Sequence, residues 1–153
     1  MRTYKAAQAA GHPDDEQKLV AEEARKAGVA PARVPKLFTG TVWGEVKMPR
    51  ENGACSNNVT FAPGSRTGWH RHEGGQMLYG LAGNGLVVTR SGEVTRIFDG
   101  VVVHVGPNEE HWHGAMPDSF MTHLSCELVG ETEIYDEVTD SDYAAAVEKA
   151  RSL

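Results

Sequence analysis

The chain has 153 residues, the length of one ordinary globular domain with room for a hydrophobic core. Its 15 basic and 21 acidic residues give a net charge of −6, and Lys and Arg form no cluster, so we expect no nucleic-acid partner. No apolar run approaches the roughly 18 residues that span a membrane. The first residues lack the apolar stretch of a signal peptide, so we expect a cytoplasmic protein with no membrane partner.

Residues 1–35 predict a helical N-terminal extension. The acidic residues 14–16 follow Pro13, basic residues come later, and Gly28 lies just past the end, which are typical start and stop signals of a helix. Pro31 and Pro35 then break any helix. Because apolar residues are few, we expect this helix to pack weakly or against another subunit.

Residues 36–153 predict one all-β domain that ends in a helix. Many short apolar runs are separated by turn residues, and this spacing favours an antiparallel sandwich or barrel. Gly83-Asn84-Gly85 and Ser91-Gly92 are typical of tight hairpins. Thr139 and the residues after it can cap a short helix over 143–151. The expected strands are 41–48, 57–62, 76–82, 85–90, 94–98, 101–105, 121–128 and 133–137.

The two cysteines, Cys55 and Cys126, match no zinc motif and form no disulfide framework. We expect two small buried thiols, and a disulfide between them remains the alternative, because the sequence does not give their separation.

Two His-x-His pairs are the strongest functional signal. His70 and His72 are two residues apart, so in a strand both imidazoles face the same side. His111 and His113 repeat this spacing, and Gln76 follows the first pair after a Glu-Gly-Gly turn. Two such pairs on the inward faces of one barrel could surround a metal ion.

This ligand chemistry indicates a reactive ion. Imidazole suits Zn, Cu, Fe and Ni and tolerates Mn, and an amide oxygen adds a neutral ligand. Without a thiolate or carboxylate, the charge of a divalent ion stays uncompensated, so the ion would be a strong Lewis acid. Such an ion would favour an alkoxide, cyanide or enolate.

The histidine segments resemble the two cupin motifs. The first runs from Gly64 through His70 and His72 to Gln76, which stands where most cupins have Glu, and residues 100–111 resemble the second. Residues 59–70, 111–115 and 121–124 are similar to the small bacterial cupins that include manganese-dependent hydroxynitrile lyases. The resemblance implies a cupin-type antiparallel β-barrel, or jelly roll.

The resemblance also implies the site residues. It gives His70, His72, Gln76 and His111 as metal ligands, with Mn²⁺ as the metal and Fe²⁺, Zn²⁺ or Ni²⁺ as alternatives. It places His113 and His123 in the pocket as catalytic residues, while the alternative for His123 is a packed core histidine. Arg66 is expected either to face the pocket as a further catalytic residue or to lie at the surface.

Three functions stay open. The first is a hydroxynitrile lyase-like enzyme that cleaves a cyanohydrin into an aldehyde and HCN, or forms it, by Lewis-acid and histidine-base catalysis. The second is an Fe-dependent dioxygenase acting on a small organic substrate, and an enzyme that isomerises or decarboxylates a small oxo-acid is a variant of this class. The third is a non-catalytic cupin that binds a small molecule. Small cupins often pair through sheet edges, so we expect a homo-oligomer, a dimer or a tetramer.

Overall fold

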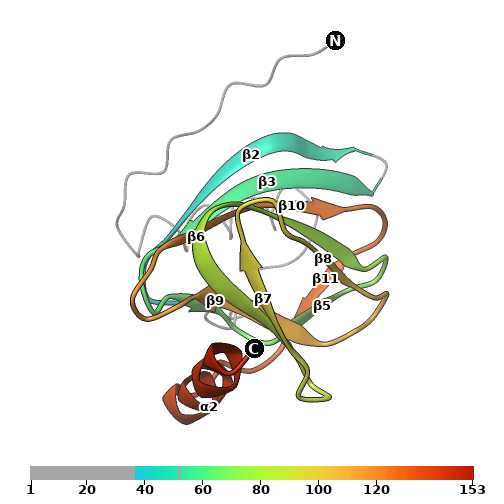
Figure 1. Cartoon of the computed structure of the whole chain (residues 1–153). Helices are drawn as coiled ribbons and strands as arrows, with labels where there is room; N and C mark the ends of the chain where they lie inside the picture. Colours follow the sequence, from blue (N-terminus) through green and yellow to red (C-terminus); the bar gives the residue numbers. More distant parts are fainter. Residues whose placement is uncertain (1–36, 52) are drawn as a thin grey trace.

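The computed structural model describes residues 37–51 and 53–153 (Figure 1). The helix expected within residues 1–35 lies outside the described residues. The described part holds a run of strands followed by one helix, α2 (Asp140–Arg151). No helix in this part is long and apolar enough to cross a membrane. The strands are β1 (Phe38–Thr39), β2 (Val42–Glu51), β3 (Ala54–Phe61), β4 (Arg66–Thr67), β5 (His70–His72), β6 (Gln76–Thr89), β7 (Val94–Phe98), β8 (Val102–Val105), β9 (His111–Ala115), β10 (Met121–Glu127) and β11 (Thr132–Ile134).

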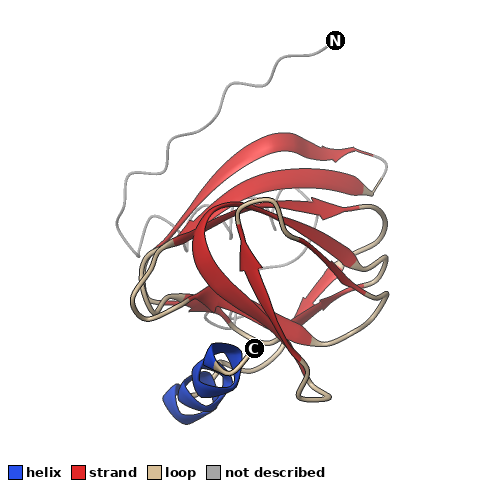
Figure 2. Cartoon of the chain, viewed as in Figure 1, coloured by secondary structure: helices blue, strands red, loops and turns tan. Residues whose placement is uncertain are grey.

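The long strand β6 joins two antiparallel sheets into a nearly closed barrel. Its first residues, Gln76–Tyr79, pair with β8 and β10, and its last residues, Gly85–Thr89, pair with β9. The main strand order is β1-β4-β9-β6-β10-β3-β2. Figure 2 shows the strands curling around a common interior with α2 outside them. The predicted antiparallel β-barrel with a short C-terminal helix is therefore confirmed.

The hairpin expected at Gly83-Asn84-Gly85 is wrong, because these residues lie within one continuous strand, β6. Gly83 has a φ of 72°, and a Cβ there would clash with the carbonyl oxygen of Phe120. Glycine thus bends β6 where it passes from one sheet to the other and does not reverse the chain. The turn at Ser91-Gly92 does form, since the Gly92 N–H donates to the Thr89 carbonyl at 2.9 Å and joins β6 to β7.

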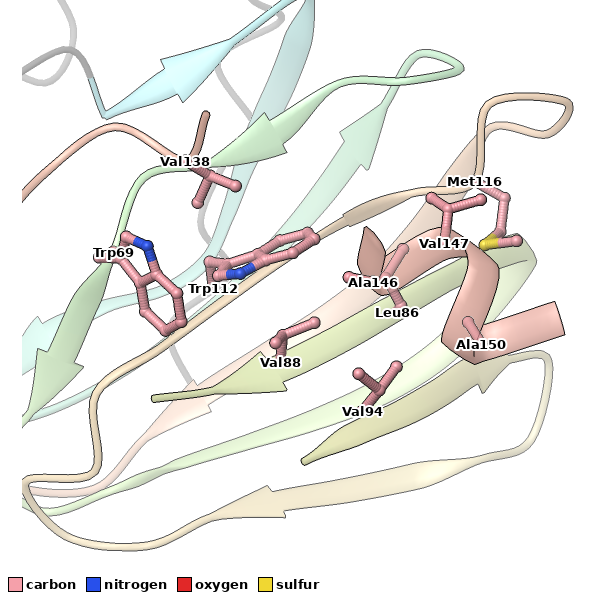
Figure 3. Packing of buried hydrophobic residues seen from close by; sticks show 10 residues of the cluster. All are labelled: Trp69, Leu86, Val88, Val94, Trp112, Met116, Val138, Ala146, Val147 and Ala150. Carbon is pink, nitrogen blue, oxygen red and sulfur yellow. The ribbon is translucent and has the colours of Figure 1, made fainter. Parts of the chain in front are cut away.

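The C-terminal helix starts earlier than expected. Thr139 is the N-cap, and its hydroxyl oxygen accepts from the Asp142 N–H at 3.1 Å, so α2 begins at Asp140. Its buried residues Ala146, Val147 and Ala150 pack on the outside of the barrel (Figure 3). The outer cluster contains Trp69, Leu86, Val88, Val94, Trp112, Met116, Val138, Ala146, Val147 and Ala150.

A second apolar cluster fills the interior. In β6, Val87 belongs to the inner cluster, while Leu86 and Val88 belong to the outer one, as the alternation of a strand requires. This alternation puts one face of each strand toward the interior. The inner cluster contains Val42, Phe61, Leu78, Val87, Ile97, Val103, Val105, Ala115 and Met121.

Both cysteines are free. In the pairing of β3 with β10, Cys55 lies opposite Glu127, and Cys126 lies opposite Ser56. The two thiols therefore point to opposite faces of the sheet, and the disulfide does not form. Burial raises the pKa of the Cys55 thiol to about 11, and the carboxylate of Glu127 adds to this effect.

Candidate metal centre

Five of the seven histidines meet in the barrel interior. His70 and His72 come from β5, His111 and His113 from β9, and His123 from β10. None of the five is more than 4% exposed. His70 lies directly opposite His111 in the pairing of β5 with β9, so the two His-x-His pairs are neighbours. The predicted convergence of these pairs is present.

Three of these histidines could hold a metal ion. One ring nitrogen from each of His70, His111 and His113 lies within 4.8 Å of the other two. The rings of His70 and His111 are closest, with centroids 4.3 Å apart. His72 lies outside this group of three, although its ring centroid is only 5.1 Å from that of His70.

Hydrogen bonds orient the histidines that were expected to be ligands. The Nδ1 atom of His70 lies 2.9 Å from the Gly68 carbonyl oxygen, and that of His111 lies 3.0 Å from the Glu109 carbonyl oxygen. A carbonyl only accepts, so in His70 the Nδ1 atom carries the proton and leaves Nε2 for a metal, and the same tautomer of His111 would leave its Nε2 for the metal. The Nε2 atom of His72 is buried and has no hydrogen-bond partner, and a cation is one partner that would satisfy it.

Gln76 adds an oxygen to this group. Its amide Nε2 donates to the Ser125 hydroxyl at 2.8 Å, and this contact turns Oε1 toward the histidines. Oε1 lies 2.9 Å from the Nε2 atom of His111. The residues that sequence reasoning gave as ligands therefore lie together, with two of their donor atoms in contact.

Three of the proposed donors, His70, His111 and His113, are neutral at neutral pH. Burial lowers the pKa of His111 to about 4, and the nearby imidazole of His72 adds to this effect. Burial and nearby imidazoles also hold the pKa values of His70 and His113 well below their usual range. Neutral imidazole is the form that binds metal, so these residues are ready to act as ligands without losing a proton.

His113, one of the three candidate donors, forms a pair with His123. The Nε2 atom of His123 lies 3.2 Å from the Nδ1 atom of His113, and their ring centroids are 4.8 Å apart. The ring of Phe61 packs on both, with centroid distances of 5.6 and 5.7 Å. Burial lowers the pKa of His123 to about 4, and its Nδ1 atom is buried without a partner. The pair therefore borders the inner apolar cluster.

Arg66 is not brought to the histidines. Its Nη2 donates to the Val138 carbonyl oxygen at 2.9 Å and to the Asp140 carboxylate at 2.6 Å. Its guanidinium carbon lies 4.7 Å from the centre of the Tyr143 ring. These partners lie on α2 and on the segment that leads into it, so the contacts of Arg66 are those of a residue that holds the helix on the barrel.

Sequence reasoning missed Glu127. Its Oε2 lies 3.4 Å from the Nδ1 atom of His72, and it also pairs with Arg50. Burial alone would raise the pKa of Glu127, but its hydrogen-bond contact with His72 and its pairing with Arg50 outweigh this effect and lower the pKa to about 2. The sequence does contain a signal for Glu127. Alternate residues of β10 share one face, and Glu127 lies on the buried face with His123 and Ser125.

Comparison with known proteins agrees with this geometry. Residues 57–124 match the family profile of the cupin domain. An (R)-mandelonitrile lyase from Granulicella tundricola is 41% identical over 111 residues, which cover 69% of this chain and 85% of that protein.

Solved structures show the same fold. A cupin-like protein from Thermotoga maritima is 36% identical, with a TM-score of 0.70 over 72% of this chain and 88% of that one. A predicted oxalate decarboxylase from the same organism has a TM-score of 0.56 at 23% identity, over 68% of this chain and 96% of that one, and supports the fold alone. From the barrel, the histidine cluster and these relatives, it follows that the chain belongs to the cupin family.

Proposed function

We propose that this protein is a metal-dependent lyase that cleaves cyanohydrins into an aldehyde and HCN, or forms them. The observation that carries the proposal is the neutral pair His113 and His123, whose His113 ring lies next to the ring nitrogens of His70 and His111 that could hold a metal. The likeness to an (R)-mandelonitrile lyase supports this reaction over the others open to such a site.

The proposed ligands are His70, His72, Gln76 and His111, and the proposed metal is Mn²⁺. The free Nε2 of His72 and the contact between Gln76 and His111 support this set. The group of His70, His111 and His113 is a second set of donors, and the two sets differ in whether His72 or His113 binds the ion. When bound, the ion would supply a Lewis acid that makes the substrate hydroxyl easier to deprotonate.

His113 and His123 would handle the proton. A neutral imidazole of the pair accepts the hydroxyl proton of the cyanohydrin, the carbon–cyanide bond breaks, and the electron pair of that bond leaves with cyanide. The proton then passes to cyanide, which leaves as HCN, and the aldehyde remains. The 3.2 Å contact between the two rings gives the proton a path from one histidine to the other.

The apolar side of the interior indicates the kind of substrate. Phe61 contacts both rings of the histidine pair, and Phe38 packs on Phe61 with ring centroids 6.2 Å apart. Phe61 and Met121 belong to the inner apolar cluster. An aromatic or aliphatic aldehyde carbon chain fits these surroundings better than a charged one, because a charge would lose its hydration there.

The test is a mandelonitrile cleavage assay on protein stripped of metal and reloaded with Mn²⁺, followed by benzaldehyde absorbance. We expect turnover that falls at least 100-fold in His123→Ala and in the metal-free protein. Equal rates in all three samples would reject the lyase. Oxygen consumption after Fe²⁺ loading, without cyanohydrin cleavage, would favour the dioxygenase instead.

A further inference from the structure

Glu127 brings a carboxylate to the Nδ1 side of His72. Besides the 3.4 Å contact between Glu127 Oε2 and His72 Nδ1, the Thr132 hydroxyl contacts both groups. Its oxygen lies 2.9 Å from His72 Nδ1 and 3.4 Å from Glu127 Oε2. Thr132 is directly opposite His72 in the pairing of β11 with β5, and Glu127 is directly opposite Gln76 in the pairing of β10 with β6. Two strand registers therefore fix this arrangement.

The hydrogen bonds have only one consistent direction. A carboxylate only accepts, so the Thr132 hydroxyl donates to Glu127. The hydroxyl oxygen is then the acceptor for a proton on His72 Nδ1. This chain of contacts keeps the proton on Nδ1 and leaves the lone pair on Nε2, the buried atom that has no partner.

The proposed ligands carry no charge of their own, since they are three imidazoles and an amide. Among the described residues, Glu127 is the only acidic side chain within 4.0 Å of a ring nitrogen of the five clustered histidines. Arg50 partly offsets its charge, but the Arg50 side chain is 37% exposed, while that of Glu127 is 11% exposed. Water therefore screens the guanidinium more than the carboxylate.

We propose that Glu127 is a positioning residue of the metal centre, acting through Thr132 and His72. It orients His72 for binding and supplies the negative charge that the ligand set lacks, and both effects raise the affinity for a divalent cation. The inference rests on the ligand role of His72 in the proposed function and adds a residue that determines how tightly the site holds its ion.

The experiment is a calorimetric titration of the metal-free full chain with Mn²⁺, without substrate. We expect Glu127→Gln, which keeps the shape and removes the charge, to weaken binding by roughly 10- to 100-fold. The matched control is Glu133→Gln, because Glu133 is an exposed acid on β11 that pairs with Arg71 outside the site. This control should stay within about twofold of the unmodified protein.

Two further variants separate positioning from simple structural support. If Glu127 only anchored Arg50, then Arg50→Met would weaken Mn²⁺ binding as much as Glu127→Gln, and this result would overturn the proposal. We expect Arg50→Met to bind at least as tightly as the control. Thr132→Val removes the bridging hydroxyl and should weaken Mn²⁺ binding several-fold. If Glu127→Gln does not fold, this variant is used in its place to test the proposal.

The visible spectrum of bound Co²⁺ gives a readout of ligand geometry. It should change in Glu127→Gln and remain unchanged in Glu133→Gln. Equal affinities in Glu127→Gln and the unmodified protein would disprove the role of Glu127 and leave the lyase proposal intact. If Glu127→Gln loses affinity as expected but the unmodified protein cleaves no cyanohydrin, the role of Glu127 is supported and the lyase proposal is rejected.

Discussion

The side-chain oxygen Oε1 of Gln76 lies 2.9 Å from the Nε2 atom of His111, and both are hydrogen-bond acceptors when His111 is neutral with its proton on Nδ1. The neutral ring has one proton for two acceptors, Gln76 Oε1 and the Glu109 carbonyl oxygen, and the low pKa of His111 does not permit a second proton near neutral pH. Two lone pairs that face each other in a buried site repel, and a cation between them removes the repulsion.

Metal binding should therefore stabilise the protein. With Mn²⁺ at about 100 times its Kd, the gain is about 2.7 kcal/mol, which corresponds to a rise in Tm of roughly 5–10 °C for a chain of this size. Gln76→Leu should lose most of this gain, because it removes the oxygen. The measurement is a thermal melt with and without Mn²⁺, Fe²⁺, Zn²⁺ and Ni²⁺, and an unchanged Tm with all four would contradict the metal site.

Removing His72 and removing His113 should affect different properties of the protein, metal binding and turnover respectively. We expect His72→Ala to weaken Mn²⁺ binding by at least tenfold, and His113→Ala to keep the metal but lose turnover. Metal content by elemental analysis, together with the cleavage rate, separates the two effects. Loss of metal in His113→Ala with normal binding in His72→Ala would assign the ion to His70, His111 and His113 instead.

The buried histidines should make the metal-free protein sensitive to acid. The pKa of His123 is lowered to about 4 in the folded state, while the unfolded chain takes up a proton near pH 6.5. The unfolded state therefore binds more protons between these values. Stability is complete above about pH 6.5 and falls toward pH 4, by at most roughly 1.4 kcal/mol per pH unit for this group.

Urea unfolding of the metal-free protein at pH 7, 5.5 and 4.5 measures this loss. His123→Phe removes one titrating group at similar volume, so its free energy of unfolding should fall less over the same range. Parallel pH profiles for the two proteins would show that His123 does not titrate between pH 6.5 and 4.

Arg66 should matter for stability and leave metal binding unchanged. Arg66→Met removes the donors to the Val138 carbonyl and the Asp140 carboxylate, and we expect a loss of about 1–3 kcal/mol in the free energy of unfolding. Arg151→Met is a suitable control, because the side chain of Arg151 is 50% exposed. Weaker Mn²⁺ binding in Arg66→Met at unchanged stability would show that Arg66 acts at the metal centre.

Association of the chain stays a prediction. β2 lies at one end of the main strand order, and Trp43, Val46 and Met48 on it are each more than one third exposed. Among the described strands only β3 pairs with β2, and an edge strand with apolar side chains favours pairing with a second copy. Size-exclusion chromatography with light scattering should give a multiple of 16.6 kDa, and a monomer mass would contradict the expected dimer or tetramer.

The sequence predicted the parts of the site that depend on local spacing. His70 with His72, and His111 with His113, share faces because each pair lies two residues apart in a strand, and this holds before any strand pairs with another. The alternation of β10 similarly puts His123 on a buried face.

Strand pairing was the part that the sequence could not supply. Arg66 faces α2 because β4 pairs with β9 in one register, with Arg66 opposite Gly114, and nothing near Arg66 in the chain encodes that register. Glu127 reaches His72 only after β10, β6, β11 and β5 have assembled. Gly83 carries the residue type of a hairpin turn and serves instead to bend one continuous strand.

The shared strand β6 also makes the barrel a single cooperative unit. Its first residue, Gln76, lies at the histidine cluster, while Leu86 and Val88 farther along support the helix. Amide protons in the middle of β6 cannot exchange with solvent unless both sheets separate, so they should report the global opening free energy. An ion held at Gln76 would then slow deuterium uptake beneath α2, on the opposite side of the barrel wall from the ion.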